Sequence, residues 1–371
     1  MSVVQIDVWD PTNGPKIFDS LNSRQEPMTI GDLVRNEIFS RVADEHPDVI
    51  ERVDSDSWQP FYKKFDQGGK NLFDGYFFPY GLIKRPSLKK SEVYASLRKD
   101  WDGQKDPQVI IDELAEYQDA FIDIKCGSNI SGNDSEFSDA LYKLYETGLP
   151  SSTYPFLMQL CKAAKVGAVD LTSATAVIKV IESFLVRRAV CGHEPTGLHA
   201  VFKKLWSDCS GSISAERVAK EIAKHKTVVW PSNEEVKAAI VSRSLDGAGI
   251  TRYFILEYDR SLKGDIPRNV PWIEHILPEN PDDEWFTVFT AEQHKELKGR
   301  LANLIPLSGE MNRSLGNSAY SKKRTRYLED SMFKSARVFA SENDAWNPVA
   351  LERRSQELAD WAVSRWPHSK L

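Results

Sequence analysis

Residue types able to cut a phosphodiester bond gather in one short part of the chain. Glu274 and His275 are adjacent within Ile273–Pro278, and Asn303 and Asn312 follow at short spacing. Glutamate and asparagine oxygens suit one Mg²⁺ or Mn²⁺ ion, a neutral histidine can take the proton of an attacking water, and an amide can orient that histidine or its backbone. The pattern predicts Glu274 and Asn312 as metal ligands, and His275 and Asn303 as catalytic residues.

Two short strands and a helix are expected to position these groups. Residues 271–275 read as a strand that ends in a turn rich in proline and acid, and residues 301–307 read as a second short strand. Because neighbouring side chains of a strand face opposite sides, Glu274 and His275 can serve different parts of one site. A helix is expected near residues 317–328, which gives a compact ββα unit.

The composition is that of an ordinary soluble protein. The chain has 371 residues, 41% hydrophobic and 27% charged, with a net charge of −6. No apolar run is long enough for a bilayer span, and the start has no signal-peptide pattern. The four cysteines are scattered without a CxxC pair, which argues against a disulfide framework or a zinc knuckle and favours a reducing, cytoplasmic location.

Most of the chain before residue 265 has a helical pattern. Thr29 and Asp32 form a capping-box-like start, and apolar stripes at helical spacing run over residues 30–42, 110–124, 157–164 and 177–185. Gly192 is a plausible C-cap of the last stripe. An alternating stretch at residues 4–8 reads as a strand, and it favours a chain that begins inside a domain over one whose partner strands lie far away. We expect a fold that is mainly α (α+β), with domains at 1–265 and 266–371 and a linker at 263–271.

Charge is distributed unevenly around the predicted site. Residues 295–337 hold ten Lys or Arg against four Asp or Glu, whereas residues 273–292 hold six acids and no Lys or Arg. A basic stretch beside an acidic, metal-suited one favours a nucleic-acid substrate, although a solvated helix face is the alternative reading of the charges alone. The residues expected to contact DNA phosphates are Lys322, Lys323, Arg324 and Arg326.

The ordered series of motifs resembles a known nuclease domain. Glu-His-Ile-Leu-Pro at 274–278, Leu-Ala-Asn-Leu at 301–304, Pro-Leu-Ser-Gly-Glu-Met-Asn at 306–312 and Lys-Lys-Arg at 322–324 look like the C-terminal HNH nuclease domain of GmrSD-type restriction enzymes. The resemblance implies a metal-dependent HNH endonuclease embedded in helices. In such enzymes the acid before the histidine and the last Asn bind metal, the histidine is the base and the middle Asn supports it. Glu274 stands where many of these enzymes have Asp.

The N-terminal part is similar to the same enzymes. Residues 17–24 with 27–36 resemble the late portion of their nucleotide-dependent sensor domain, and residues 186–192 resemble its helical extension. The early sensor motif, of an Asp-Gly-Gln type, is not in this sequence. The resemblance therefore implies a nucleotide cofactor only if an upstream sensor domain is present. It also implies double-stranded DNA, of phage origin, as the partner, and leaves open self-association.

Two functions of different class fit these observations. The first is a divalent-metal-dependent HNH endonuclease, a nickase or double-strand cutter, acting in restriction or anti-phage defence. The second is a DNA- or partner-binding sensor or regulatory module whose nuclease site is subordinate or silent. His294 in a helix expected over 290–301, and Asn22 and Arg24 near the start, are weaker candidates for contacts with substrate or nucleotide. A metal between His193 and His199 is weaker still.

Overall fold

The protein is described from a computed structural model, which covers residues 28–42, 45–67, 70–132, 135–209, 211–262 and 271–368. These residues are mainly helical, and they divide into two compact units, Met1–Ile122 and Asp123–Leu371. The mainly α expectation is confirmed. The strand expected at residues 4–8 and the sensor-like residues 17–24 lie outside the described residues, as does nearly all of the expected linker at 263–271.

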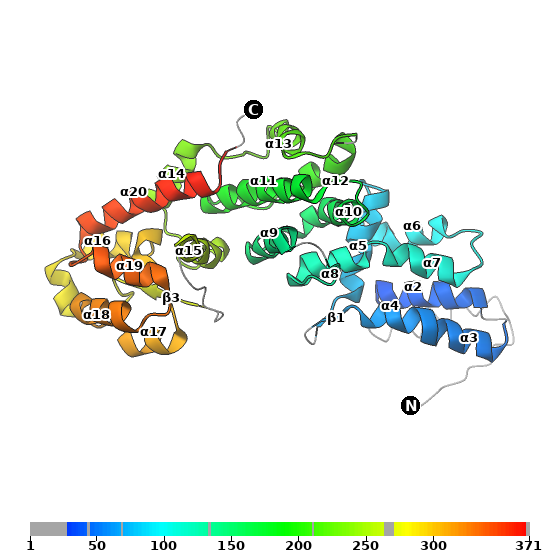
Figure 1. The fold of residues 1–371 in the computed structure, drawn as a ribbon, viewed down its shortest axis with the longest axis horizontal. Helices are drawn as coiled ribbons and strands as arrows, with labels where there is room; N and C mark the ends of the chain where they lie inside the picture. Colours follow the sequence, from blue (N-terminus) through cyan, green and yellow to red (C-terminus); the bar gives the residue numbers. More distant parts are fainter. Residues whose placement is uncertain are drawn as a thin grey trace. The chain divides into compact units, whose positions relative to one another are not determined.

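The first unit is built from short helices around an aromatic core. Its helices are α2 (Ile30–Phe39), α3 (Pro47–Val53), α4 (Gln59–Lys63), α5 (Phe73–Lys84), α6 (Val93–Asp100) and α7 (Pro107–Ala115), with a small β1–β2 hairpin at Asp66–Gln67 and Lys70–Asn71 (Figure 1). Helix α2 starts where the sequence predicts, since Thr29 and Asp32 form both bonds of a capping box. In the core, Phe73 packs edge to face against Trp58 and Phe65, and Phe61 does so against Phe65.

The apolar stripe at residues 110–124 forms two helices rather than one. Helix α7 ends at Ala115, and α8 (Gln118–Cys126) begins after a turn at residues 116–117. Both Ile110 and Phe121 are buried. A tight turn between two helices can keep the apolar positions facing one core, so helical periodicity alone does not reveal the break.

The second unit begins with a layer of helices organised around α11 (Leu171–Val190). Asp170 caps its start, and Gly192, at φ 76°, follows its end in the left-handed conformation that favours glycine. The other helices of this part are α9 (Ser135–Glu146), α10 (Tyr154–Lys165), α12 (Leu198–Asp208), α13 (Ala215–Ala223), α14 (Asn233–Ser242) and α15 (Gly249–Ser261).

The rest of the second unit holds the two strands of the predicted site. They are β3 (Trp272–His275) and β4 (Leu304–Leu307), and the helices are α16 (Ala291–Leu297), α17 (Gly309–Leu315), α18 (Tyr320–Asp330), α19 (Lys334–Glu342) and α20 (Pro348–Arg365). Ile240 of α14, Phe254 of α15, Ile305 of β4 and Leu351 of α20 belong to one buried apolar cluster. Helices before residue 265 thus share a core with the strands, while the domain boundary expected at 265/266 falls outside the described residues.

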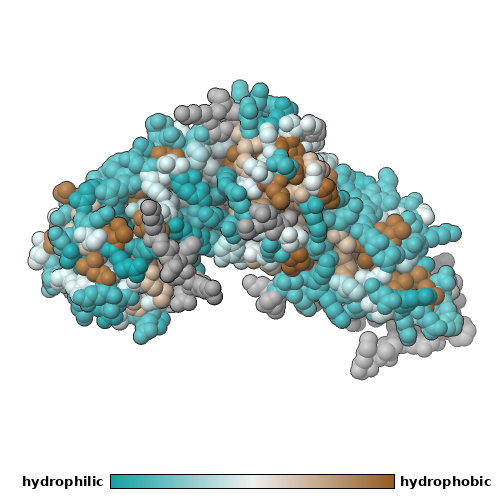
Figure 2. Space-filling view, in the orientation of Figure 1, coloured by the Kyte–Doolittle hydropathy of each residue, from teal (hydrophilic) through white to brown (hydrophobic). Residues whose placement is uncertain are grey.

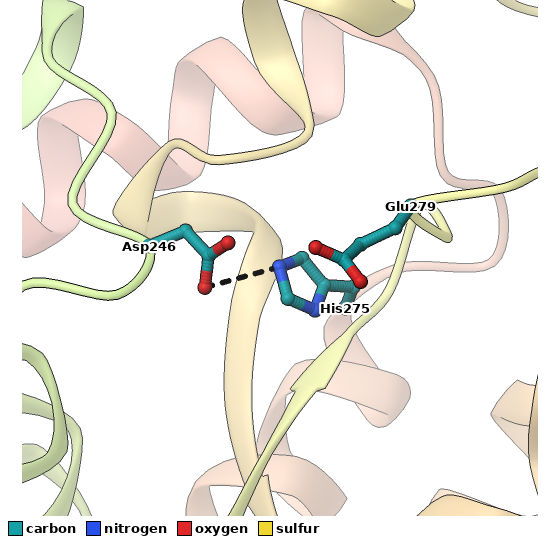
Figure 3. Close-up of side chains that lie close together, drawn as sticks. All are labelled: Asp246, His275 and Glu279. Atoms are coloured by element: carbon teal, nitrogen blue, oxygen red, sulfur yellow. Dashed lines mark ion pairs between the residues drawn. The ribbon is translucent and has the colours of Figure 1, made fainter.

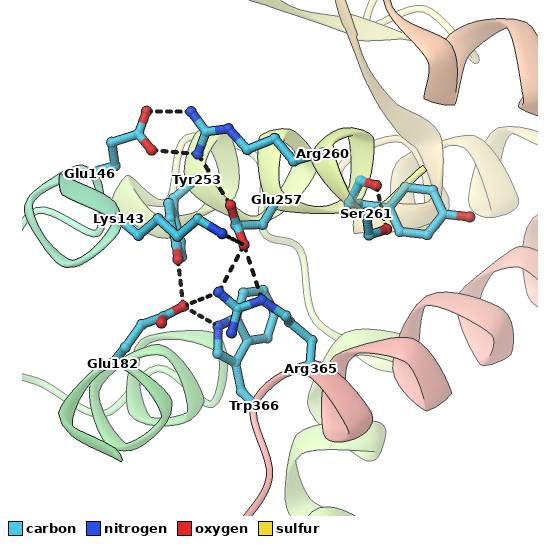
Figure 4. A network of polar contacts seen from close by, with 10 residues as sticks. Lys143, Glu146, Glu182, Tyr253, Glu257, Arg260, Ser261, Arg365 and Trp366 are labelled. Atoms are coloured by element: carbon cyan, nitrogen blue, oxygen red, sulfur yellow. Dashed lines mark hydrogen bonds and ion pairs between the residues drawn. The ribbon is translucent and has the colours of Figure 1, made fainter. Parts of the chain in front are cut away.

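A network of charged groups ties helices of this unit together (Figure 4). Glu182 on α11 accepts hydrogen bonds from Tyr253 (2.5 Å), Arg365 (2.7 Å) and Trp366 (2.7 Å). Glu257 on α15 pairs with Arg365 at 2.8 Å. Glu182 and Trp366 lie 184 residues apart in sequence, so the contacts fasten the end of α20 to α11 and α15.

The surface and helix lengths agree with the composition. The face in Figure 2 is mostly hydrophilic, with hydrophobic residues in separate small groups. Among the described residues, no helix combines the length and the apolar character that crossing a bilayer requires.

Candidate functional site

The site is built on a two-stranded antiparallel ladder. Glu274 of β3 lies opposite Ile305 of β4, and His275 lies opposite Leu304. Ser308 then caps the start of α17, which packs against β3. Two strands pair and a helix follows them, but α16 lies between the strands and residues 301–303, expected in the second strand, form a 3₁₀ turn. The helix after β4 is α17 at residues 309–315, earlier than expected, and α18 follows it.

Glu274 points into the protein interior. Its side chain is buried, and its Oε1 accepts hydrogen bonds from Lys323 Nζ and Tyr327 OH, both at 2.7 Å. Burial lowers the pKa of Lys323, although the Glu274 carboxylate opposes this shift. Burial and the nearby Glu274 carboxylate both raise the pKa of Tyr327. Two protein donors thus occupy Oε1 of this carboxylate. The metal-ligand role expected of Glu274 stays a prediction.

His275 faces the other side of the strand, as the alternation predicts. Its Nε2 is buried and makes no hydrogen bond, but it lies 3.3 Å from Asp246 Oδ1, which is an ion pair when the imidazole is protonated. One donor atom each of Asp246, His275 and Glu279 lies within 4.8 Å of the others. Figure 3 shows the two carboxylates on either side of the imidazole ring. In the part of the chain that is described, this is the one group of three His, Cys, Asp or Glu side chains spaced for a metal ion.

Asn303 holds the backbone that follows His275. It is fully buried, its Nδ2 donates to Leu277 O and Lys298 O, and its Oδ1 accepts from Leu277 N, all at 2.8 Å. Trp346 Nε1 adds a fourth bond at 3.1 Å. The amide thus fixes the turn after the strand, one of the two uses expected for it, and it does so without contacting the imidazole.

Asn312 of helix α17 is hydrogen-bonded to strand β3. It lies on α17, is half-buried, and donates from Nδ2 to Ile273 O at 3.0 Å. This contact positions α17 against β3. The role of Asn312 as a metal ligand stays a prediction.

The basic residues of α18 do not form one exposed surface. Lys322 is exposed, but Lys323 is fully buried against Glu274. Arg324 donates to Ala340 O, Asn343 O and Asp344 Oδ1, and Arg326 pairs with Asp330 at 2.5 Å. Residues four apart share one helix face, so Lys323 and Tyr327 reach Glu274 together. Lys323 is therefore corrected from a DNA contact to a structural residue, while Lys322 keeps the exposure that a phosphate contact needs.

Buried groups that the sequence did not single out also support the site. Arg354 of α20 donates to Ala302 O and to Leu304 O, on either side of Asn303, and burial lowers the pKa of Arg354 to about 10. Asp246 and Glu279 beside His275 were equally unforeseen. Glu279 directly follows the Glu-His-Ile-Leu-Pro motif at 274–278, so its position in the sequence could have marked it as a site residue. Asp246 stands in a common Asp-Gly turn far from this motif, so the sequence does not mark it.

The remaining histidines have other placements. Nε2 of His294 lies 2.8 Å from Pro278 O, and since a carbonyl only accepts, this nitrogen donates. His294 thereby braces the turn that carries Glu279. His193 and His199 are both exposed, and the metal-suited group described above does not include them. Asn22 and Arg24 lie outside the described residues.

Comparison with known proteins bears on the same region. A search of curated proteins found no match to the chain. Residues 230–361 match the family model described as GmrSD restriction endonucleases, C-terminal domain. The matched segment contains Asp246, His275, Glu279 and Asn303, and it leaves the earlier, sensor-like resemblance a prediction. Residues 230–361 are thus similar to the C-terminal domain of the GmrSD restriction endonucleases.

Proposed function

We propose that this chain contains a divalent-metal-dependent DNA endonuclease of the HNH type, centred on His275. The observation that carries the proposal is the buried His275 Nε2, which lies 3.3 Å from Asp246 Oδ1 and close to Glu279. It lies at the end of β3, within a segment similar to a restriction-endonuclease domain.

The groups present suit phosphodiester hydrolysis. A divalent ion such as Mg²⁺ or Mn²⁺, when bound, supplies a Lewis acid for the charge that develops on the phosphate. Asp246 and Glu279 offer carboxylate oxygens for it beside His275, whose imidazole has the chemistry to take a proton from water. Asn303 acts as a positioning residue, since it holds the Leu277 backbone on both its N–H and its carbonyl.

The biological role follows from the family similarity. Enzymes of restriction act on DNA, so we propose double-stranded DNA, of phage origin, as the substrate and defence as the role. Phosphate contacts position a DNA backbone without reading its sequence, and exposed Lys322 is the contact from α18 that we propose. Nucleotide control would belong to a sensor domain.

The experiment is nicking of supercoiled plasmid by the purified chain with Mg²⁺ or Mn²⁺. His275→Ala is expected to lower the rate by about 10²–10⁴-fold, the usual effect of losing a proton-transfer group. His199→Ala, an exposed histidine on α12, is the matched control and should keep the wild-type rate. Excess EDTA should abolish nicking.

Two outcomes would overturn the proposal. One is unchanged nicking by folded His275→Ala protein or in EDTA. The other is tight DNA binding without any cleavage in either metal, which would instead support the regulatory module.

A further inference from the structure

We infer that Trp272, supported by Gly309 and Arg313 of α17, forms a stacking surface for an unpaired base of DNA. The class of ligand is an opened or single-stranded segment, which offers a flat base face together with a phosphate. The place of this segment beside a cleavage site rests on the proposed function, whereas its binding to Trp272 does not.

Trp272 is exposed although it carries a large, mainly apolar side chain. It is the first residue of β3 and is 52% exposed. The other tryptophans that the structure describes are buried or half-buried. Tryptophan is well buried on average in folded proteins, and its rigid ring is enriched at binding interfaces. The exposure of Trp272 therefore points to a partner outside the chain.

The indole ring is held flat against helix α17. A Cβ on Gly309 would lie 2.7, 3.0 and 3.1 Å from Nε1, Cδ1 and Cε2 of Trp272. These nearly equal distances place Gly309 against the face of the ring, because an approach at its edge would leave one atom clearly nearer than the other two. The glycine thus lets one face of the indole rest on the helix backbone, while much of the residue stays open to a ligand.

Arg313 adds a cation to the same arrangement. It lies one helical turn after Gly309, and residues four apart share one face of a helix. Its guanidinium carbon lies 5.6 Å from the centre of the Trp272 ring, a distance at which a cation is attracted to the ring. Asn312 ties this helix to β3 through Ile273 O. The ring and the cation are therefore positioned before a ligand arrives, which lowers the entropic cost of binding.

The charge around the ring selects a nucleic acid over an apolar protein surface. Arg313 is exposed, and within the described ranges no carboxylate forms an ion pair with it. It belongs to the segment 295–337, which holds ten Lys or Arg against four Asp or Glu. An exposed guanidinium beside an open aromatic ring suits a phosphate and the base attached to it. An apolar protein partner would leave this cation without a counter-charge.

The position of Trp272 favours an unpaired base over an intact duplex. Trp272 and His275 are three residues apart in β3, which is about 10 Å along a strand, or about three base steps of DNA. Their side chains leave the strand on opposite sides, so a stiff duplex that lies on one does not present a base face to the other. An opened DNA strand is flexible, and its bases have their faces free for stacking.

The test measures binding of fluorescein-labelled DNA to the full chain by fluorescence anisotropy, in EDTA so that metal-dependent cleavage does not occur. The probes are a duplex with a central mismatched bubble and a fully paired duplex of the same length. Trp272→Ala should weaken bubble binding by about 5–150-fold, the range found when an aromatic ring that stacks on one base is removed. The same change should leave duplex binding nearly unchanged.

Further variants separate the ring from the cation. Gly309→Ala keeps the indole but pushes it off the helix, so bubble binding should fall. Arg313→Gln should weaken binding of both probes and flatten its salt dependence, because a phosphate contact is common to both. Tyr142→Ala on α9 removes another aromatic ring, 45% exposed, and is the matched control that should bind as the parent chain does. Circular dichroism checks that each variant is folded.

Each result supports or overturns the inference. A preference of the parent chain for the bubble that disappears in Trp272→Ala and Gly309→Ala supports it. Equal binding of bubble and duplex by the parent chain overturns it, as does unchanged bubble binding by folded Trp272→Ala protein. Bubble binding that depends on Trp272 in a chain that nicks no plasmid would keep this inference and reject the proposed function. Metal-dependent nicking by a chain without a bubble preference would do the reverse.

Discussion

Asn303 is a single residue on which four buried groups depend. Replacing it with alanine leaves the N–H and carbonyl of Leu277, the carbonyl of Lys298 and the indole N–H of Trp346 without this partner. An unsatisfied buried group costs about 1–3 kcal/mol. We expect Asn303→Ala to lower the free energy of unfolding by at least about 3 kcal/mol in urea denaturation. Asn280→Ala, in the exposed turn, should change it little; equal values for the two variants would contradict this role.

Lys322 and Lys323 are neighbours with opposite expected effects. Lys323→Ala leaves Glu274 as an unpaired buried charge, and breaking such a pair costs about 3–5 kcal/mol. Lys322→Ala should leave stability unchanged and flatten the salt dependence of DNA binding, where each neutralised phosphate contributes a log–log slope of roughly −0.9. Urea denaturation and DNA-binding titrations over a salt series measure the two effects. A reversed pattern would restore Lys323 as a DNA contact.

The 244–248 loop is held to Gly299, since the backbone N–H groups of Leu245 and Asp246 both donate to Gly299 O, at 2.9 and 3.1 Å. Gly299→Ala would place a methyl group on Ser244 Oγ and Cβ, at 2.2 and 3.2 Å. We expect this change to displace Asp246 from His275 and to lower the rate of Mn²⁺-dependent plasmid nicking. Adding Ser244→Gly removes both clashing atoms and should restore the nicking rate. No loss in the single variant, or no recovery in the double variant, would show that this contact does not position Asp246.

Elements with local signals could be predicted from the sequence, and those that depend on distant contacts could not. The capping box of Thr29 and Asp32, and Gly192 after α11, lie within a few residues of the helix ends they define. His275 and Asn303 stood out as motif residues. The burial of Lys323 was not predicted, because a run of cations usually marks a solvated face and only Glu274 on another element makes this one an exception. The proximity of Asp246 depends likewise on Gly299.

At the scale of the second unit, the charged network predicts an acid-sensitive fold. Burial alone would raise the pKa of Glu257, but Lys143, Arg365 and Arg260 outweigh this and hold it below its usual value. The resulting stability is fully present above the unfolded pKa of about 4.3. It is lost as pH falls through the lower, folded pKa.

We therefore expect the unfolding temperature of the wild-type chain to decrease once the pH is lowered beneath about 4.3. The unfolding temperature of the Glu257→Gln protein should be lower than that of the wild type at neutral pH. It should also decrease less as the pH is lowered. Differential scanning calorimetry over a pH series measures both, with Glu329→Gln, an exposed carboxylate on α18, as the control. Parallel curves for the wild-type and Glu257→Gln proteins would contradict the assignment.

The fastening of α20 to earlier helices has a consequence for protein synthesis. Arg354 holds the backbone on both sides of Asn303, and Arg365 and Trp366 reach Glu182 on α11. These side chains are translated after every other described part of the site. A nascent chain on the ribosome can therefore form α11 and the β3–β4 ladder, but it lacks the groups that lock them until α20 has emerged. The site is therefore completed only after α20 has been translated. A chain that is interrupted before α20 lacks these contacts.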